Sequence, residues 1–510
     1  MRSALIGIRL LRGVAAAAVA LAVTELLSVL FGQNADALNA VGSTVIDLTP
    51  GPVKEWAIST FGTSDKLFLA ITLITVIVVL AALAGLAETR RRPLGSAAIV
   101  VAGIAAAAAV LSRAGADGLD VIPVCVGTAT GVAVLRLLTV KSAPDQPDPD
   151  THPTDPQRRH WLTALVLLGV GVAGGVGGRL LASAVHSVAG ERAAFKAPQV
   201  AAPAPPPVAE VQPTGVALPP FITPNPDFYR IDTALNIPQL PRDSWRLRIH
   251  GMVDREITLS FDDLAAFPVI EKTVTLTCVS NPVGGDLISN ATWTGYRVRD
   301  LLSRTGIHPD ADMVLSTSVD GFTAGTPVQA LTDDRDALLA ITMNGQPLPA
   351  EHGYPARLVV PGLYGYASAT KWVVDLELTR FDRAKAYWTG LGWADKAPVK
   401  TASRIDVPKS LQNVPTGPVR FGGVAWAQNR GVSRVEVGID NGEWRSAQLA
   451  SAYSNDTWRL WSYDWNVAPS GDHTIRVRAT DNTGALQVEQ PADPMPDGAT
   501  GWHTVAFSVG

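Results

Sequence analysis

Five long apolar stretches dominate the first 190 residues and constrain the fold more than any other feature of the sequence. A helix of roughly 20 residues is needed to cross the hydrocarbon core of a membrane. The stretches are residues 13–31, 67–87, 94–111, 119–140 and 161–188. Five such stretches in succession, with short polar loops between them, favour transmembrane helices over helices buried in a soluble domain. The sequence therefore predicts a chain held in a lipid bilayer.

The Lys and Arg residues of the short loops indicate an orientation, because basic loops stay on the cytoplasmic side. They precede the first stretch, join the second to the third, and surround the connection between the fourth and the fifth. These residues are Arg2, Arg9, Arg12, Arg90, Arg91, Arg92, Arg136, Lys141, Arg158 and Arg159. All of these loops fall on the same side of a membrane that is crossed five times. We therefore expect a cytoplasmic N-terminus and an extracytoplasmic position for everything after the fifth helix.

The second part of the chain has the composition of a water-soluble protein. Charged and aromatic residues concentrate after Phe221, and the net charge of the whole chain is only −4. Such a charge gives no reason to expect nucleic acid as a partner. Residues 191–220 are rich in Pro, Ala and Val, which predicts a stiff, extended linker without a packed core. We expect this linker to lift the soluble part off the bilayer.

Two patterns of secondary structure follow the linker and predict two soluble domains. Residues 221–397 mix short β-branched runs with helical segments, which predicts an α+β domain. Its candidate strands are 245–250, 272–278, 313–319, 356–360 and 371–378, and its candidate helices are 261–267 and 298–303. Residues 398–510 lack helix patterns and carry evenly spaced strands at 419–426, 433–440, 458–465 and 473–479. The predicted fold is multi-domain: a five-helix transmembrane region in residues 1–190, an α+β domain and an all-β, immunoglobulin-like sandwich.

Cys278 is the residue of the soluble part that suggests chemistry. It ends an alternating run and opens a glycine-containing loop, so a strand end can hold it firmly beside a ligand. Two alternatives stay open: a small buried apolar residue, which free cysteine usually is, and a nucleophile with His308 or His352 as its base. No second cysteine or histidine stands at a spacing that makes a zinc site. The other cysteine, Cys125, lies in an apolar stretch, so no disulfide between the two is expected.

Several segments resemble the sulfite oxidase family of molybdopterin-dependent oxidoreductases. Residues 275–281 read TLTCVSN, residues 286–295 read DLISNATWTG, and residues 352–362 read HGYPARLVVPG, followed by Thr-Lys-Trp at 370–372. They occur in the order in which the family has them. Residues 423–431, GVAWAQNRG, resemble the family's C-terminal dimerisation domain, so a homodimer is possible. The resemblance covers essentially Phe221 to the C-terminus.

The resemblance implies a molybdenum–molybdopterin cofactor and assigns roles residue by residue. It makes Cys278 the thiolate that binds molybdenum, with the pterin dithiolene and oxo groups as the other ligands. The residues that match cofactor-binding positions are Tyr229, Arg230, Cys278, Ser318, His352, Arg357, Thr370 and Lys371. Among these, His352, Arg357 and Lys371 match positions that hold the pterin and its phosphate, for which Arg offers a fork of donors and Lys a point charge.

The resemblance also implies how a small anionic substrate is bound. Arginines around the molybdenum attract the anion in sulfite oxidases, and Arg230 and Arg430 match two of them, so they join the thiolate as the implied catalytic residues. The sequence departs from the family in other places. Residues 280–283 supply no arginine where the family often has two, and Asp232 stands where a histidine is usual. Trp393 is expected in place of the pocket tyrosine.

The fifth apolar stretch is preceded by Gln157-Arg158-Arg159-His160-Trp161-Leu162, which resembles a twin-arginine export signal. An ordinary pair of cytoplasmic arginines is the alternative. In the family, the pterin cofactor is inserted into folded protein in the cytoplasm. An extracytoplasmic domain of this family must therefore cross the membrane folded, which is the task of the twin-arginine route.

The resemblance implies two-electron oxygen-atom transfer on a small oxyanion, with the oxidation of sulfite to sulfate as the first expectation. The sequence contains no Cys-x-x-Cys-His motif for haem attachment, so no haem is expected. Electrons must then pass to or from a separate redox partner, such as a cytochrome or a quinone-linked protein. The second hypothesis is a reductase of sulfoxides or similar S- or N-oxides. A hypothesis of another class is a non-catalytic membrane protein that retains the fold.

Overall fold

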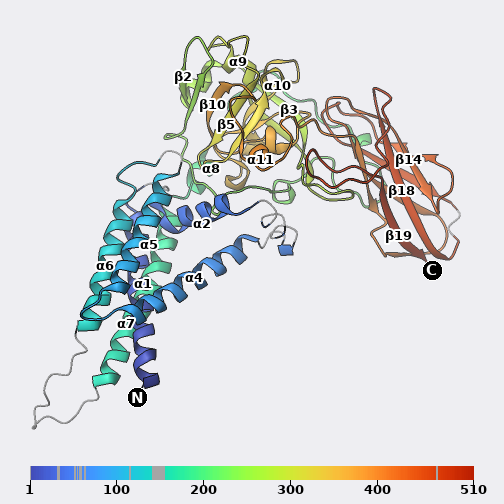
Figure 1. Cartoon of the computed structure of the whole chain (residues 1–510). Helices are drawn as coiled ribbons and strands as arrows, with labels where there is room; N and C mark the ends of the chain where they lie inside the picture. The colour runs from blue at the N-terminus through green and yellow to red at the C-terminus, as the bar shows by residue number, and fades with distance from the viewer. Residues whose placement is uncertain are drawn as a thin grey trace, which may run out of the picture. The chain divides into compact units, whose positions relative to one another are not determined.

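Figure 1 shows the computed structural model of the chain, which describes residues 2–31, 35–50, 53, 56, 60–61, 65–113, 116–140, 156–466 and 469–510. The chain divides into two compact units. The helical unit contains Met1–Ser187 with Thr233–Gln239, and the sheet unit contains Val188–Asp232 with Leu240–Gly510. The apolar stretches lie in the helical unit, and the residues with implied chemical roles lie in the sheet unit.

The helical unit contains five helices that are long and apolar enough to cross a membrane. They are α1 (Arg2–Ser28), α4 (Asp65–Ala87), α5 (Leu94–Leu111), α6 (Ile122–Val140) and α7 (Pro156–Val185). A shorter apolar helix, α2 (Ala37–Leu48), lies between α1 and α4 in the sequence. The five predicted helices are thereby confirmed, although α1 begins eleven residues before the predicted start at Gly13. Arg158 and Arg159 lie in the first turn of α7.

Small residues let the helices of this unit approach closely. A Cβ atom at Gly13 of α1 would overlap the carbonyl oxygen of Ala81 in α4, and one at Gly127 of α6 would overlap the hydroxyl of Thr24 in α1. Close packing through small residues is how helices associate in lipid, where burial of apolar surface gives no driving force. The Gly- and Ala-rich composition therefore suits helix packing as well as membrane insertion.

The sheet unit begins with two five-stranded sheets, here called the double-sheet domain. One has the strand order β2-β1-β10-β5-β6, and the other has β3-β4-β7-β8 with β9 paired to β7. The strands are β1 (Arg246–Gly251), β2 (Ile257–Ser260), β3 (Val269–Thr277), β4 (Ile288–Arg297), β5 (Met313–Ser318), β6 (Thr323–Pro327), β7 (Leu338–Met343), β8 (Gln346–Pro347), β9 (Arg357–Val359) and β10 (Val373–Thr379). Leu247 and Leu376 of one sheet share a buried core with Leu339 and Leu358 of the other. β5 and β9 contribute Val314 and Leu358 to this core, whereas Val274 and Leu276, near the end of β3, belong to a second buried core.

Helices contribute less to this domain than the sequence predicts. The segment predicted as a helix at 261–267 forms a short 3-10 helix, η5 (Asp262–Ala266), and the segment at 298–303 forms α9 (Val298–Leu302). The other described helices here, α10 (Val328–Thr332) and α11 (Tyr387–Gly390), are equally short. The domain is therefore rich in sheet, because its helices are single turns that connect strands.

The C-terminal part of the sheet unit is a β-sandwich. Its sheets have the strand orders β11-β13-β17-β16 and β12-β19-β18-β14-β15. The strands are β11 (Ala402–Val407), β12 (Asn413–Val414), β13 (Val419–Trp426), β14 (Val432–Ile439), β15 (Arg445–Ser446), β16 (Gln448–Leu449), β17 (Arg459–Trp465), β18 (Gly471–Asp481) and β19 (His503–Val509). Phe421 and Trp461 of the first sheet pack with Val435 and Phe507 of the second in one buried core. The four strands predicted from alternation correspond to β13, β14, β17 and β18.

Residues 191–220 differ from the predicted spacer. After the short helix α8 (Ala189–Ala194), the chain is extended but lies on the sheet unit: Ala202 accepts a 2.9 Å hydrogen bond from the N–H of Glu271. Farther along, the carbonyl of Pro205 accepts one of 2.6 Å from the hydroxyl of Tyr453 in the sandwich. Residues 195–223, here called the strap, therefore bind both domains. Composition misled the prediction because Pro lacks an N–H but keeps a carbonyl acceptor.

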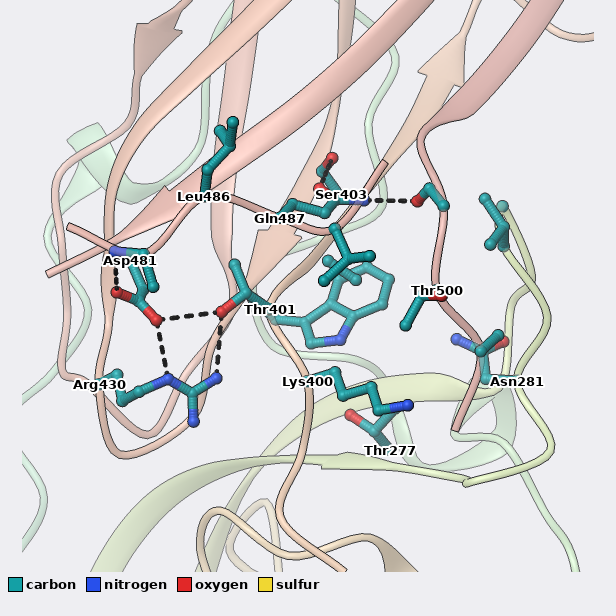
Figure 2. Close-up of a pocket in the computed structure, with 18 of the residues that line it drawn as sticks. Thr277, Asn281, Lys400, Thr401, Ser403, Arg430, Asp481, Leu486, Gln487 and Thr500 are labelled. Carbon is teal, nitrogen blue, oxygen red and sulfur yellow. Dashed lines mark hydrogen bonds and ion pairs between the residues drawn. The ribbon is translucent and has the colours of Figure 1, made fainter. Parts of the chain in front are cut away.

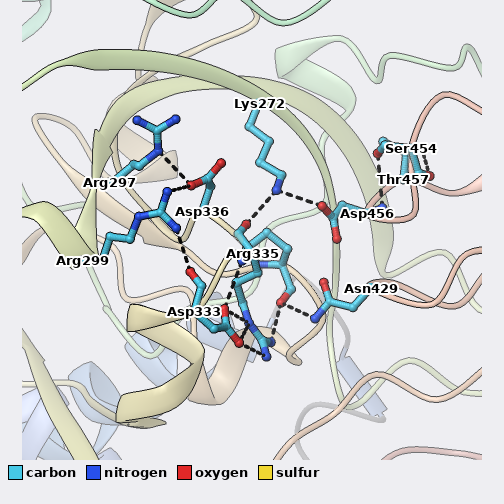
Figure 3. A network of polar contacts seen from close by, with 11 residues as sticks. Lys272, Arg297, Arg299, Asp333, Arg335, Asp336, Asn429, Ser454, Asp456 and Thr457 are labelled. Carbon is cyan, nitrogen blue, oxygen red and sulfur yellow. Dashed lines mark hydrogen bonds and ion pairs between the residues drawn. The ribbon is translucent and has the colours of Figure 1, made fainter.

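A polar network also joins the two domains of the sheet unit (Figure 3). The Nζ atom of Lys272 lies 2.9 Å from Oδ2 of Asp456 and donates to the carbonyl of Arg335 at 2.7 Å. The carbonyl of Pro361 accepts from Nη1 of Arg335 at 3.0 Å and from Nδ2 of Asn429 at 3.3 Å. The sandwich loop that carries Asn429 is therefore held against the double-sheet domain.

Candidate active site

Cys278 lies directly after β3, where the strand ends. Its N–H donates to the carbonyl of Leu287 at 3.0 Å, which closes the intervening loop. Asn281 braces the inside of this loop, because its N–H donates to the carbonyl of Cys278 at 3.2 Å and its Oδ1 accepts from the N–H of Leu287 at 3.0 Å. Only 9 % of Cys278 is exposed. The thiol is thus held at a fixed point beside the loop, as its place in the sequence predicts.

The surroundings of Cys278 do not provide a base for a nucleophilic thiol. Burial raises the pKa of this thiol, although hydrogen bonds with Ser280 oppose the rise. Of the two histidines considered as bases, His308 pairs with Asp254 at 3.3 Å, and the ring of His352 packs against Phe228. Within the described residues no histidine forms a hydrogen bond with Cys278. The structure therefore does not support the Cys–His alternative, whereas a strong local cation, such as a bound metal, would keep the sulfur as a thiolate.

Arg357, the first residue of β9, is a buried cation. Its guanidinium donates to the carbonyls of His352 at 3.2 Å and Ala369 at 3.3 Å, and it lies over the ring of Trp293 at 5.0 Å. Burial lowers the pKa of Arg357 to about 10. Among the described residues no carboxylate pairs with it, although an arginine this deeply buried normally has one. An anionic ligand bound beside it would supply the missing charge.

His352 and Lys371 lie near Arg357 and complete a group of nitrogen donors. Burial, followed by the charges of Arg357 and Lys371, lowers the pKa of His352 to about 3, so its ring is neutral at physiological pH. Burial likewise lowers the pKa of Lys371 to about 8, against the attraction of Asp232. Its Nζ donates to Oδ2 of Asp232 at 2.8 Å and to the carbonyl of Glu351 at 3.1 Å. The structure thus brings these three nitrogen-bearing side chains together.

Tyr229 and Arg230 approach the site from the segment before β1. Burial and then the nearby Cys278 raise the pKa of the Tyr229 hydroxyl, which is therefore a neutral hydrogen-bond group. Arg230 is half exposed, and its Nε donates to Oδ2 of Asp232 at 2.8 Å. Asp232 stands where the family usually has a histidine. Its carboxylate binds both Arg230 and Lys371 and compensates their charge.

Ser318 and Thr370 differ in their access to a ligand. Ser318 ends β5, and its buried hydroxyl makes no hydrogen bond to any described residue, while burial raises the pKa of nearby Asp320. Thr370 is fully buried, and its hydroxyl lies 2.7 Å from that of Ser316 in the core. Its hydroxyl therefore ties the segment before β10 to β5. The sequence pattern could not distinguish this structural role from a direct contact with the cofactor. Asp320 was not predicted from the sequence, because no pattern marks it.

These residues fit an anionic cofactor that carries a phosphate and brings its own metal ligands. Donors suited to phosphate and to the ring nitrogens and oxygens of a pterin come from the buried Arg357, from Lys371, which is paired with Asp232, and from the neutral ring of His352. In the described part of the chain, no group of three His, Cys, Asp or Glu side chains could hold a metal ion. A metal at Cys278 would take its remaining ligands from such a cofactor.

A cavity of about 460 Å³ opens beside the Cys278 loop, between the double-sheet domain and the sandwich (Figure 2). Thr277 and Asn281, on either side of Cys278, line one wall. Arg430 lines the sandwich side, whereas Cys278 and Arg230 are not among the lining residues. The two arginines that were predicted to share the substrate therefore do not both face this cavity.

Arg430 is held by a buried carboxylate. Its Nε donates to Oδ2 of Asp481 at 2.9 Å, and its Nη2 donates to Oγ1 of Thr401 at 3.1 Å (Figure 2). Nη2 also donates to the carbonyl of Val399 at 3.0 Å. Burial opposes ionisation of Asp481, but hydrogen bonds from Thr483 and Arg430 prevail and lower the pKa of Asp481 to about 2. Asp481 is therefore charged, and the pair fixes the guanidinium in the cavity wall.

Tyr364 is the tyrosine of the cavity. Burial raises the pKa of Tyr364 to about 12, and Cys278 and Arg430 are both near enough to influence it. Trp393, which was expected at this place, does not line the cavity and packs against Tyr366 at 5.8 Å instead. Sequence reasoning missed Tyr364 because no pattern around it marks a cavity residue.

Comparisons with known proteins agree with this geometry. A family model described as the oxidoreductase molybdopterin binding domain matches residues 234–388. Mitochondrial sulfite oxidase from Homo sapiens is 32 % identical over 304 residues, which cover 50 % of this chain and 55 % of that protein. Sulfite oxidase from Gallus gallus is 30 % identical over 321 residues, covering 53 % and 69 %. The uncharacterized oxidoreductase YuiH from Bacillus subtilis is 34 % identical over 149 residues, covering 29 % and 72 %.

The chain spans about half the length of the first of these curated relatives, 55 % of human sulfite oxidase. The matched residues include Cys278, Arg357 and Lys371, which the geometry places around a candidate cofactor site. This chain belongs to the sulfite oxidase family of molybdopterin-dependent oxidoreductases.

Proposed function

We propose that this chain transfers an oxygen atom at a molybdenum cofactor to a small sulfur oxyanion, with the oxidation of sulfite to sulfate as the first candidate reaction. The observation that supports the proposal is a buried Arg357 that lacks a carboxylate partner among the described residues and that lies, with Cys278, near Tyr229. A lone thiol and an uncompensated cation are what a pterin-bound metal and its phosphate require.

The site residues would have three roles: binding the metal, holding the cofactor and orienting the substrate. Cys278 would anchor the metal as a thiolate, while Arg357, Lys371 and His352 would hold the pterin and its phosphate. When bound, the cofactor supplies the two-electron redox change and the exchange of oxygen with water. Arg430 would orient the substrate from the sandwich side, because one of its nitrogens, Nη1, makes no hydrogen bond to any described residue.

The reaction requires a redox partner. Sulfite and water yield sulfate, two protons and two electrons, so a cytochrome or a quinone-linked protein would accept the electrons. The five apolar helices support attachment to a membrane. We further propose a cytoplasmic N-terminus, an extracytoplasmic catalytic domain, and an immunoglobulin-like sandwich that pairs two chains.

Metal content tests the core of the proposal. Purified full-length protein from a molybdenum-replete host should contain about one molybdenum per chain and show its electron paramagnetic resonance signal after partial reduction. Cys278→Ser should lose sulfite turnover, whereas Cys125→Ser, the matched control in α6, should keep it. A metal-free wild type would favour a non-catalytic membrane protein, and full turnover of Cys278→Ser would refute the proposal.

A second candidate is the reduction of sulfoxides or similar oxides. The observation that favours it is the pairing of the cavity cation Arg430 with Asp481, which weakens the attraction for an anion. Steady-state assays with sulfite plus an electron acceptor, and with methionine sulfoxide plus an electron donor, separate the two reactions.

The export route can be tested independently. Arg158 and Arg159 open α7, directly before its apolar part. Replacing both with Lys should keep the cofactor-loaded domain in the cytoplasm, because the twin-arginine route requires the arginine pair. Protease accessibility in intact cells reports the outcome, and arrival of loaded protein outside would refute this route.

A further inference from the structure

A buried arginine of the sandwich binds the loop that follows Cys278. Arg404 lies in β11, and its Nη1 donates to the carbonyl of Gly285 at 2.8 Å. Its Nε donates to Oδ1 of Asp406 at 2.9 Å. The side chains of this pair are 9 % and 10 % exposed. Because the buried carboxylate holds one side of the guanidinium, the nitrogen that binds Gly285 has a fixed direction.

The stability of the sandwich does not explain why this ion pair is buried. An apolar pair of similar volume is often as stable in such a place, because two charges lose their hydration on burial. Oδ2 of Asp406 is also buried without a hydrogen bond to any described residue. Burial raises the pKa of Asp406, against the charge of Arg404. The defined contribution of the pair is therefore the hydrogen bond that Arg404 gives to the loop.

A second residue of the sandwich fits the same loop. The imidazole of His503 occupies the space that a Cβ atom at Gly284 would need, and the backbone of Gly284 has a φ of +80°. The ring is fixed because its Nδ1 accepts from the N–H of Ile405 at 3.0 Å. Burial, followed by the charge of Arg404, lowers the pKa of His503 to about 4, so the ring is neutral. Only glycine allows the loop to pass this close to the ring.

The loop connects these contacts to the thiol through its own hydrogen bonds. The N–H of Gly285 donates to the carbonyl of Pro282 at 2.9 Å, and the N–H of Cys278 donates to the carbonyl of Leu287 at 3.0 Å. Hydrogen bonds of Ser280, inside the loop, oppose the rise that burial causes in the pKa of the thiol. A displacement of Gly285 would therefore move the groups that set the position of the sulfur and its hydrogen bonds.

We infer that Arg404 is a positioning residue: by binding the carbonyl of Gly285, it holds the sulfur of Cys278 in the orientation in which it binds the metal. The inference rests on the proposed function, because it concerns the thiolate that is proposed there as a metal ligand. Arg404 acts through residues 279–286 and is not itself a ligand. The orientation of a sulfur ligand and its hydrogen bonds tune the electronic properties of the metal. The sandwich thereby influences the metal from another domain.

Arg404→Lys tests the inference because it separates charge from geometry. Lysine keeps the positive charge beside Asp406, but its ammonium group lacks the fork that binds Asp406 and Gly285 together. In full-length, cofactor-free protein with Cys125→Ser, iodoacetamide should alkylate Cys278 about tenfold faster once Arg404 is replaced, because the loop opens more often. In the holoenzyme, the molybdenum electron paramagnetic resonance signal should shift from its wild-type g values.

Arg459→Lys is the matched control. Arg459 is a half-buried arginine that donates to the carbonyls of Ala450 and Val432 at 2.8 and 2.7 Å, and both acceptors lie in the sandwich. This variant should leave the alkylation rate and the signal unchanged. If Arg404→Lys fails to fold, the double variant Arg404→Met/Asp406→Leu, which removes both buried charges, should show the same two changes.

An unchanged alkylation rate in a folded variant would overturn the inference. Faster alkylation with an unchanged molybdenum signal would also overturn it, because the arginine would then only cover the thiol. The alkylation rate is measured without the cofactor, so it reports on the sulfur even if the wild type contains no molybdenum, the result that counts against the proposed function. The two failures are therefore distinguishable.

Discussion

The Nε2 atom of Gln428 donates a 2.9 Å hydrogen bond to the hydroxyl oxygen of Thr277. Thr277 directly precedes Cys278, and Gln428 precedes Arg430 by two residues, so this contact joins the two halves of the site. Gln428 is 1 % exposed, and its Nε2 also donates to the carbonyl of Thr275 at 3.3 Å. The sandwich therefore fixes the strand end that carries the thiol.

Replacing Gln428 with Leu should displace Arg430 relative to Cys278. The buried acceptors of Thr275 and Thr277 would lose their donor, which costs about 1–3 kcal/mol. We expect the KM for sulfite to rise roughly tenfold, in line with that cost, while the molybdenum content of the protein stays constant. Gln448→Leu, at an exposed position of β16, is the control. Loss of molybdenum with an unchanged KM would contradict this positioning role.

Arg357→Met should separate cofactor binding from protein stability. The variant removes a buried cation that has no carboxylate partner among the described residues, so the cofactor-free protein should be no less stable. The purified variant should contain about one tenth of the wild-type cofactor or less, because the phosphate loses charge-assisted hydrogen bonds. Metal analysis and scanning calorimetry give the two readouts. Arg297→Met, at the end of β4 and paired with Asp336, is the control and should keep its cofactor.

His352 should make the cofactor-free protein sensitive to acid. Burial lowers the pKa of His352 to about 3 in the folded state, below the ordinary value of 6.5. Between these values the unfolded chain binds more protons, so stability is present above pH 6.5 and is lost as the pH falls toward 3. The slope should reach about 1.4 kcal/mol per pH unit. His352→Gln should flatten the pH dependence of the melting temperature, and an unchanged slope would refute this cause.

The Lys272–Asp456 ion pair should couple the two domains of the sheet unit. Its side chains are 20 % and 14 % exposed. A double-mutant cycle with Lys272→Met and Asp456→Asn should give a coupling energy of about 1–3 kcal/mol. The pair Arg248–Glu256, with side chains 52 % and 56 % exposed, should show no measurable coupling. Equal coupling in both pairs would show that the network in Figure 3 does not join the domains.

Local patterns predicted the features that depend on local sequence. The alternation before Cys278 specified a strand that ends at the thiol, and the structure has β3 end at Thr277. The apolar stretches specified five helices because length and composition suffice for that inference. The group of His352, Arg357 and Lys371 could be named because the family motif carries all three.

Contacts between distant segments could not be predicted in this way. Asp481 binds Arg430 across 51 residues, and no pattern around either residue indicates the pairing. Thr370 matched a cofactor-binding position, yet its hydroxyl bonds to Ser316 in a neighbouring strand. The strap was misjudged for the same reason, since its composition says nothing about the partners of its carbonyl groups.

The strap also determines where the sheet unit can be severed from its helices. The carbonyl of Phe221 accepts hydrogen bonds from Nδ2 of Asn290 at 2.8 Å and from Nε1 of Trp458 at 2.9 Å. A protein produced from residue 221 onward would keep these two bonds but would lose residues 195–220, whose carbonyls bind Glu271 of β3 and Tyr453 of the sandwich. Cleavage before Val188 keeps the whole strap, and with it these contacts, so a protease site for releasing the sheet unit is best placed there.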